Sequence, residues 1–167
     1  DRLVSLANPG IPVTARSQEL TGITTEMIAD APDPFEVVSR LASWIKERPV
    51  VAHNAFFDLG FLRHEGQRTR NPADPTVKFN PPLIDTLALS RLMMPELKKH
   101  QLAVVARQLG VSLDQAHRAE ADALACGGIF AALWAKSGVQ SAGELNQLAG
   151  RVNRDALLDH KYPVYHV

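Results

Sequence analysis

The spacing of apolar residues changes from an alternation to a helical stripe within the first fifty positions. Apolar and polar residues alternate over residues 2–7, and the Asn8-Pro9-Gly10 stretch that follows is typical of a turn. This pattern predicts a strand that runs into a turn. Residues 17–32 are rich in turn formers and predict turns and short helical pieces.

A complete helix-start signal follows at residues 33–36. Asp33 can cap the helix, Pro34 suits its first position, and Glu36 completes a capping box. The next apolar residues recur at helical spacing, so this helix is expected to pack on a core. The predicted stripe consists of Val37, Val38, Leu41, Trp44 and Ile45.

Strand-like and helix-like segments then alternate, which favours an α/β domain. The predicted strands are 49–53 and 82–86, the predicted helices are 55–65, 87–94, 100–110 and 118–138, and residues 66–82 are predicted to form a loop. Gly138 is the expected C-cap of the last of these helices. We therefore predict one domain over residues 1–138, and residues 139–167 as a helical tail or the start of a linker.

The composition is typical of a soluble globular protein, with 46% hydrophobic and 22% charged residues in 167. Eighteen basic and eighteen acidic residues cancel, so any contact with nucleic acid must be local or mediated by metal. Cys126 is the only cysteine, and neither a signal peptide nor a membrane-spanning stretch is visible. We expect a cytoplasmic protein without a membrane partner.

One candidate carboxylate lies just after the predicted strand at residues 49–53. His53 ends this strand, Asn54 turns the chain, and Asp58 falls in the first turn of the next helix. In open α/β sheets the active crevice lies beyond the carboxyl ends of the strands, where Asp58 would face it. The alternative is that Asp58 only complements the helix dipole.

A second candidate pair is His117 and Asp122. On one continuous helix, residues five apart would lie on different faces. With His117 in the preceding loop and Asp122 in the first turns, however, both side chains could reach one site. A histidine placed in this way can move a proton, whereas the simpler alternative is a surface or capping histidine.

Two carboxylates and a histidine on separate elements match the needs of phosphodiester hydrolysis. Cations neutralise the phosphate and generate hydroxide near neutral pH, and magnesium prefers oxygen ligands. A histidine beside the attacking water can act as general base.

Four short motifs occur in one order along the chain: LTGIT at 20–24, HNAFFD at 53–58, DTLALSR at 85–91 and HRAEAD at 117–122. Together they resemble the DEDDh branch of the DnaQ-like 3′–5′ exonucleases, over about residues 1–137. The resemblance implies a ribonuclease H-like fold, in which helices flank a mixed sheet. It also implies hydrolysis with two Mg²⁺ or Mn²⁺ ions at the single-stranded 3′ end of DNA, with RNA as a possible substrate. DNA polymerase subunits are implied as possible partners, in proofreading or repair.

The resemblance also implies roles for individual residues. Asp58 and Asp122 would be catalytic metal ligands, and His117 would be the general base. The pocket for the terminal nucleotide would be lined by Leu20, Thr21, Gly22, Ile23, His53, Asn54 and Phe57.

One part of the family pattern is absent from the sequence. The family's first motif is an Asp-x-Glu on the first strand, and no Asp-x-Glu occurs in these 167 residues. In the family this motif precedes the segment that matches residues 5–10. We therefore expect the first strands of the fold to be missing, and this chain alone to be inactive.

Two alternatives to a nuclease remain. One is a non-catalytic module that keeps the nucleotide pocket and serves as a replisome or repair scaffold. The other is an unrelated phosphoesterase with a similar sheet. The acidic residues and the histidine favour a nuclease over the scaffold, and the first two motifs disfavour the phosphoesterase.

Overall fold

The computed structural model describes residues 1–68, 77, 79–114, 118–141, 143–145, 147–148 and 150. These residues form two compact units. Of the described residues, those within 1–50, 56–82 and 118–120 belong to the first unit, and those within 51–55, 83–114 and 121–150 belong to the second. The elements are α1 (Ala15–Thr21), α2 (Thr25–Ile28), α3 (Pro34–Ile45), β1 (Val50–Ala52), α4 (Ala55–Gln67), β2 (Leu83–Asp85), α5 (Thr86–Met93), α6 (Leu102–Gln108) and α7 (Ala119–Ser137).

The predicted start of α3 is confirmed. The Asp33 carboxylate accepts a hydrogen bond from the Phe35 N–H at 2.8 Å, and Pro34 occupies the first turn. Val38 and Ile45 are buried, as the stripe predicts. Trp44 departs from the stripe, since 38% of its surface is exposed and its ring instead faces the Arg48 guanidinium at 5.2 Å. Trp44 therefore makes a cation–π contact at the surface and is not a core residue.

The strand predicted at residues 2–7 is wrong, since residues 1–9 form neither helix nor strand. Alternation produces a strand only where another strand offers hydrogen bonds. With the described residues, the backbone of this segment makes one backbone–backbone hydrogen bond, from the Asn8 N–H to the Pro32 carbonyl, and its longer-range side-chain bonds run from Asn8 to Ala29 and from Arg2 to Glu120. The turn after it is confirmed. Gly10 has a positive φ of 76°, and its N–H donates to the Asn8 side chain.

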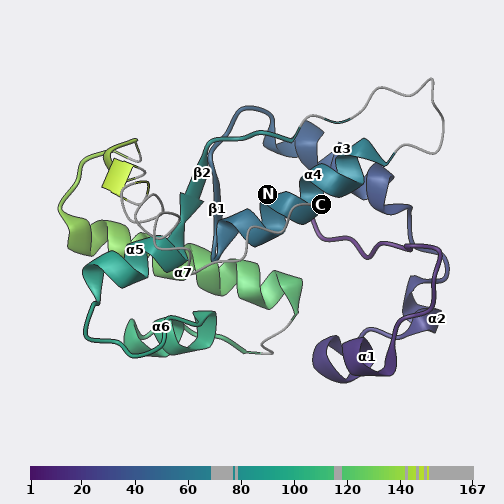
Figure 1. The fold of residues 1–167 in the computed structure, drawn as a ribbon, viewed down its shortest axis with the longest axis horizontal. Coiled ribbons are helices and arrows are strands. Elements are labelled where there is room, and N and C mark those ends of the chain that lie inside the picture. The colour runs from purple at the N-terminus through teal and green to yellow at the C-terminus, as the bar shows by residue number, and fades with distance from the viewer. Residues whose placement is uncertain are drawn as a thin grey trace, which may run out of the picture. The chain divides into compact units, whose positions relative to one another are not determined.

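The second unit is organised around β2. Strands β1 and β2 form a small parallel sheet, and α5, α6 and α7 gather beside β2 (Figure 1). Their buried side chains form one hydrophobic cluster, consisting of Ile84, Ala88, Leu89, Met94, Val105, Ala106, Ile129, Leu133 and Leu145. The predicted α/β class is confirmed.

Helix α7 carries two glycines in its middle, which differ in what surrounds them. A Cβ atom on Gly128 would lie 2.7 Å from Cγ1 of Val111, whereas a Cβ on Gly127 would meet nothing within 4 Å. Gly128 is therefore the residue that lets the Val111 segment approach the helix. Gly138 follows the end of α7 with φ 70°, as predicted for a C-cap. Within the described part of the chain, no helix is both long and apolar enough to cross a membrane.

Candidate functional site

The turn between β1 and α4 is held by a buried carboxylate. Asn54 has a positive φ of 67°, and its N–H donates to Oδ1 of Asp85 at 3.0 Å. The same oxygen accepts the Leu87 N–H at 2.9 Å, so Asp85 also caps α5. Asp85 is only 5% exposed. One carboxylate thus fixes the left-handed residue after β1 and the helix after β2.

His53, which ends the strand segment, is held at both ring nitrogens. Nε2 lies 2.8 Å from the carbonyl oxygen of His100, and Nδ1 lies 3.0 Å from Oγ1 of Thr86. Because a carbonyl only accepts, Nε2 carries the proton and donates it. Burial lowers the pKa of His53, against the opposing effects of the His100 carbonyl and the Asp85 carboxylate. Burial therefore shifts the imidazole toward its neutral form.

Thr86 and Ser90 extend these contacts into α5. Both are fully buried, and the Thr86 hydroxyl also lies 3.2 Å from the Ala52 carbonyl oxygen. The Ser90 hydroxyl lies 3.1 Å from Nδ1 of His100. Sequence reasoning assigned no role to Asp85 or to these hydroxyls. The signal was present, since an aspartate between an apolar run and a helical stretch is a typical N-cap.

Asp58 and Phe57 lie in the first turns of α4, in the first unit. Both are exposed, and the ring of Phe57 packs edge-on against that of Phe61 with centroids 5.0 Å apart. Phe57 and Phe61 remain 57% and 59% exposed. This end of α4 therefore presents a carboxylate beside an accessible aromatic pair.

The segment from Leu20 to Ile23 forms the end of α1, also in the first unit. Gly22 is the left-handed C-cap with φ 66°, and its N–H donates to the Gln18 carbonyl. The Thr21 hydroxyl donates to the Ser17 carbonyl and accepts the Ile23 N–H. Leu20 is 56% exposed. The Thr21 hydroxyl and the N–H groups of Gly22 and Ile23 are thus engaged locally, and the exposed Leu20 side chain is apolar.

The third motif is described in part. Asp122 lies in the first turns of α7, partly buried, in the second unit, while His117 lies outside the described residues. Asp58 and Asp122 have the oxygen chemistry that magnesium prefers. They do not complete a site, because the described residues contain no cluster of three His, Cys, Asp or Glu side chains able to hold a metal ion. Two carboxylates rarely hold magnesium without further ligands such as substrate phosphates.

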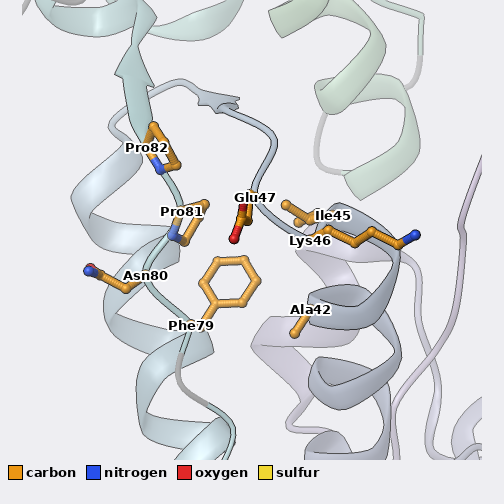
Figure 2. A pocket seen from close by; sticks show the side chains of 8 residues that line it. All are labelled: Ala42, Ile45, Lys46, Glu47, Phe79, Asn80, Pro81 and Pro82. Carbon is orange, nitrogen blue, oxygen red and sulfur yellow. The ribbon is translucent and has the colours of Figure 1, made fainter.

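A cavity of about 410 Å³ lies elsewhere in the first unit, between the end of α3 and the segment 79–82 (Figure 2). Phe79 projects into it beneath the Glu47 carboxylate, with Ala42 and Ile45 on the facing wall. Its lining includes none of the predicted site residues. We assign the candidate site to the motif residues and not to this cavity.

The fold is that of a known exonuclease. Exonuclease X, solved in complex with 5′ overhanging duplex DNA, superposes with a TM-score of 0.65 over 87% of this chain and 79% of its own, at 22% identity. A family model described as exonuclease, RNase_T, matches residues 1–130. The chain belongs to this exonuclease family, which confirms the resemblance to DnaQ-like exonucleases.

Several relatives are DNA polymerases III of the PolC type. The chain is 42% identical to the protein of Bacillus cereus over 127 residues, 76% of this chain and 8% of that protein. It is 37% identical to the protein of Bacillus subtilis over 156 residues, 92% of this chain and 11% of that protein. The chain thus spans about a tenth of the length of these relatives.

Proposed function

We propose that the chain contributes to a 3′–5′ exonuclease that removes nucleotides from the 3′ end of single-stranded DNA. The observation that carries this proposal is the match of residues 1–130 to the exonuclease family, within which the four motifs lie in order. The PolC-type relatives and the DNA-bound exonuclease X favour DNA as the substrate and proofreading as the role. A polymerase is then the natural protein partner.

In this function Asp58 and Asp122 would hold divalent ions, Mg²⁺ or Mn²⁺, together with the substrate phosphates. Bound ions would neutralise the phosphate and supply hydroxide near neutral pH. His117 would take the proton from the attacking water as general base. Leu20–Ile23 and Phe57 would receive the terminal nucleotide, since Leu20 and Phe57 are accessible apolar surfaces for a base.

We further propose that the 167 residues by themselves do not hydrolyse DNA. Two-metal catalysis places two cations about 3.5–4 Å apart across the scissile phosphate, which needs more ligands than two aspartates. The sequence contains no Asp-x-Glu to supply them. In this proposal the acidic pair is supplied from outside these 167 residues.

The test compares the chain with a version extended before Asp1 by an apolar strand that carries Asp-x-Glu. A strand carrying Ala-x-Ala is the matched control. A 5′-labelled single-stranded oligonucleotide is followed with Mg²⁺, with Mn²⁺ and with excess chelator. We expect a one-nucleotide ladder from the Asp-x-Glu version in either metal and from no other sample. In that version His117→Ala should slow the ladder by roughly 10²–10⁴-fold and leave metal binding unchanged.

Two results would contradict the proposal. A ladder from the unextended chain would show that the acidic pair is dispensable. Binding of 3′ ends by the extended version without cleavage would favour the scaffold.

A further inference from the structure

The guanidinium of Arg118 covers the glycine of the first motif. A Cβ atom at position 22 would lie 3.2 Å from Nη2, 3.8 Å from Cζ and 3.9 Å from Nε of Arg118. Both residues belong to the first unit. Three atoms of the same guanidinium thus approach one backbone position, and a Cβ at residue 22 would push the nearest of them back by a few tenths of an ångström. Gly22 therefore leaves room for the cation at this end of α1.

The guanidinium donors are not used within the described residues. Arg118 is partly buried, and it makes no hydrogen bond or ion pair with that part of the chain. The carboxylate of Glu120, two residues further on, is bound by Arg2 instead. No backbone carbonyl of α1 accepts from Arg118, and the Gln18 and Ser17 carbonyls accept from the Gly22 N–H and the Thr21 hydroxyl instead.

Other arginines of the first unit are engaged by their own neighbours. The Nε–H of Arg48 donates to the Ile45 carbonyl, that of Arg63 donates to the Phe79 carbonyl, and Arg68 pairs with Glu65. Arg118 differs from these arginines because it is partly buried and its guanidinium N–H groups make no hydrogen bond with the described residues. A guanidinium fork matches the geometry of a phosphate, to which it can donate two parallel hydrogen bonds.

We propose that Arg118 binds a phosphate of the strand whose terminal nucleotide lies against Leu20–Ile23. The inference rests on the proposed function, and it adds a residue to the site there described. The exposed Leu20 side chain offers an apolar surface to a base, and the adjacent guanidinium offers a cation to the phosphodiester. In a chain with no net charge, such a local cation is what directs a polyanion to one surface.

The test measures binding of a 5′-fluorescein single-stranded oligonucleotide by anisotropy, with the full chain in chelator and over a series of salt concentrations. Each neutralised phosphate contributes about 0.7 to the slope of log K against log salt for single strands. Arg118→Gln should lower that slope by about 0.7 and weaken binding most at low salt. Arg118→Lys should keep the slope, because the charge remains. Arg40→Gln removes an exposed charge on α3 and should leave both quantities unchanged.

A second measurement changes the oligonucleotide as well as the protein. Oligonucleotides with one uncharged methylphosphonate at each of the last three linkages are bound to the wild type and to Arg118→Gln. At one linkage the wild type should lose affinity while the variant should not, which identifies the phosphate that Arg118 contacts. If Arg118→Gln does not fold, the modified oligonucleotides are compared between the wild type and Arg118→Lys. A loss of about 0.7 in the salt slope at the same single linkage in both proteins then supports the contact.

The outcomes separate the two proposals. If neither the wild type in chelator nor the Asp-x-Glu extended version with Mg²⁺ binds the oligonucleotide, the proposed function fails. If the wild type binds, but the slope of Arg118→Gln equals that of the wild type and no linkage distinguishes them, the assignment to Arg118 is overturned and the proposed function stands.

Discussion

The two units bury their apolar side chains differently. In the second unit the buried residues of β2, α5, α6 and α7 join in one cluster. Among the described residues, most of the exposed large apolar side chains belong to the first unit, including Val4, Ile11, Leu20, Met27, Phe56, Phe57 and Phe61, whereas Leu92 and Leu124 are exposed in the second. Burial of apolar surface is the main source of folding free energy. The second unit is therefore expected to be the rigid part, and the first to display surface for binding.

The two tryptophans make this difference measurable, because Trp44 belongs to the first unit and Trp134 to the second. Trp134 is partly buried, packs edge-on against Phe130 and donates to the Val139 carbonyl. Fluorescence of Trp44→Phe and Trp134→Phe backgrounds then reports the unfolding of each unit separately.

The largest effect is expected from the core of α7. Leu133 is fully buried, so Leu133→Ala should lower the free energy of unfolding of the second unit by about 2–5 kcal/mol. Phe61→Ala in the first unit removes a larger but exposed side chain and should cost less than about 1 kcal/mol. Urea titrations of the two backgrounds measure both values. Equal losses would show that the first unit relies on its surface aromatics as a core.

The next comparison concerns two helix caps. Asp85→Ala leaves two N–H groups, of Asn54 and Leu87, without their buried acceptor and should cost about 2 kcal/mol. Asp33→Ala removes a half-buried cap and should cost about 1 kcal/mol. The same titrations apply, each read by the tryptophan of its own unit. A cost for Asp33→Ala as large as that for Asp85→Ala would mean that the burial of the carboxylate does not matter.

A smaller effect of opposite sign is expected from the glycines of α7. Gly127→Ala should stabilise the second unit by about 0.5–1 kcal/mol, because alanine favours the helix and the space is open. Gly128→Ala should destabilise it by about 1 kcal/mol, because the new methyl group meets Val111. Thermal unfolding followed at Trp134 separates the two. A gain from both substitutions would show that the Val111 segment yields without cost.

The smallest effect is a dependence on pH. Burial lowers the pKa of His53 in the folded state below the value of about 6.5 in the unfolded chain. In the window between these two values the unfolded state binds more protons, so the stability of the second unit should fall as pH falls below 6.5. The loss should level off below the folded pKa. His53→Gln should flatten this window relative to the wild type, and an unchanged slope would contradict the assignment to His53.

Much of the fold could be predicted from local signals. The Asp33-Pro34 start of α3, the strand before His53 and the Gly138 end of α7 depend on neighbouring residues, and all three are confirmed. Whether residues 2–7 form a strand could not be predicted from neighbouring residues. Its pattern was right for a strand, but a strand exists only with a partner, which the alternation of one segment cannot reveal.

The site shows the same division. Asp58 at the start of α4 and Asp122 near the start of α7 lie where the sequence placed them along the chain. Their roles, like that of His117, remain predictions. The bonds that join His53 to His100 and Asn54 to Asp85 link residues 31 or more positions apart. Such contacts follow from tertiary packing and not from periodicity.

The single thiol of the chain records how often the second unit opens. Cys126 is 5% exposed and its sulfur lies 3.5 Å from the buried Thr86 hydroxyl. An alkylating reagent needs access to the thiolate, so it reacts only in molecules whose α7 has moved away from α5. The rate at which the mass of one adduct per chain appears therefore measures how often the native protein opens at this position. A ligand that stabilises this unit should slow the alkylation of Cys126, and the measurement needs no introduced label.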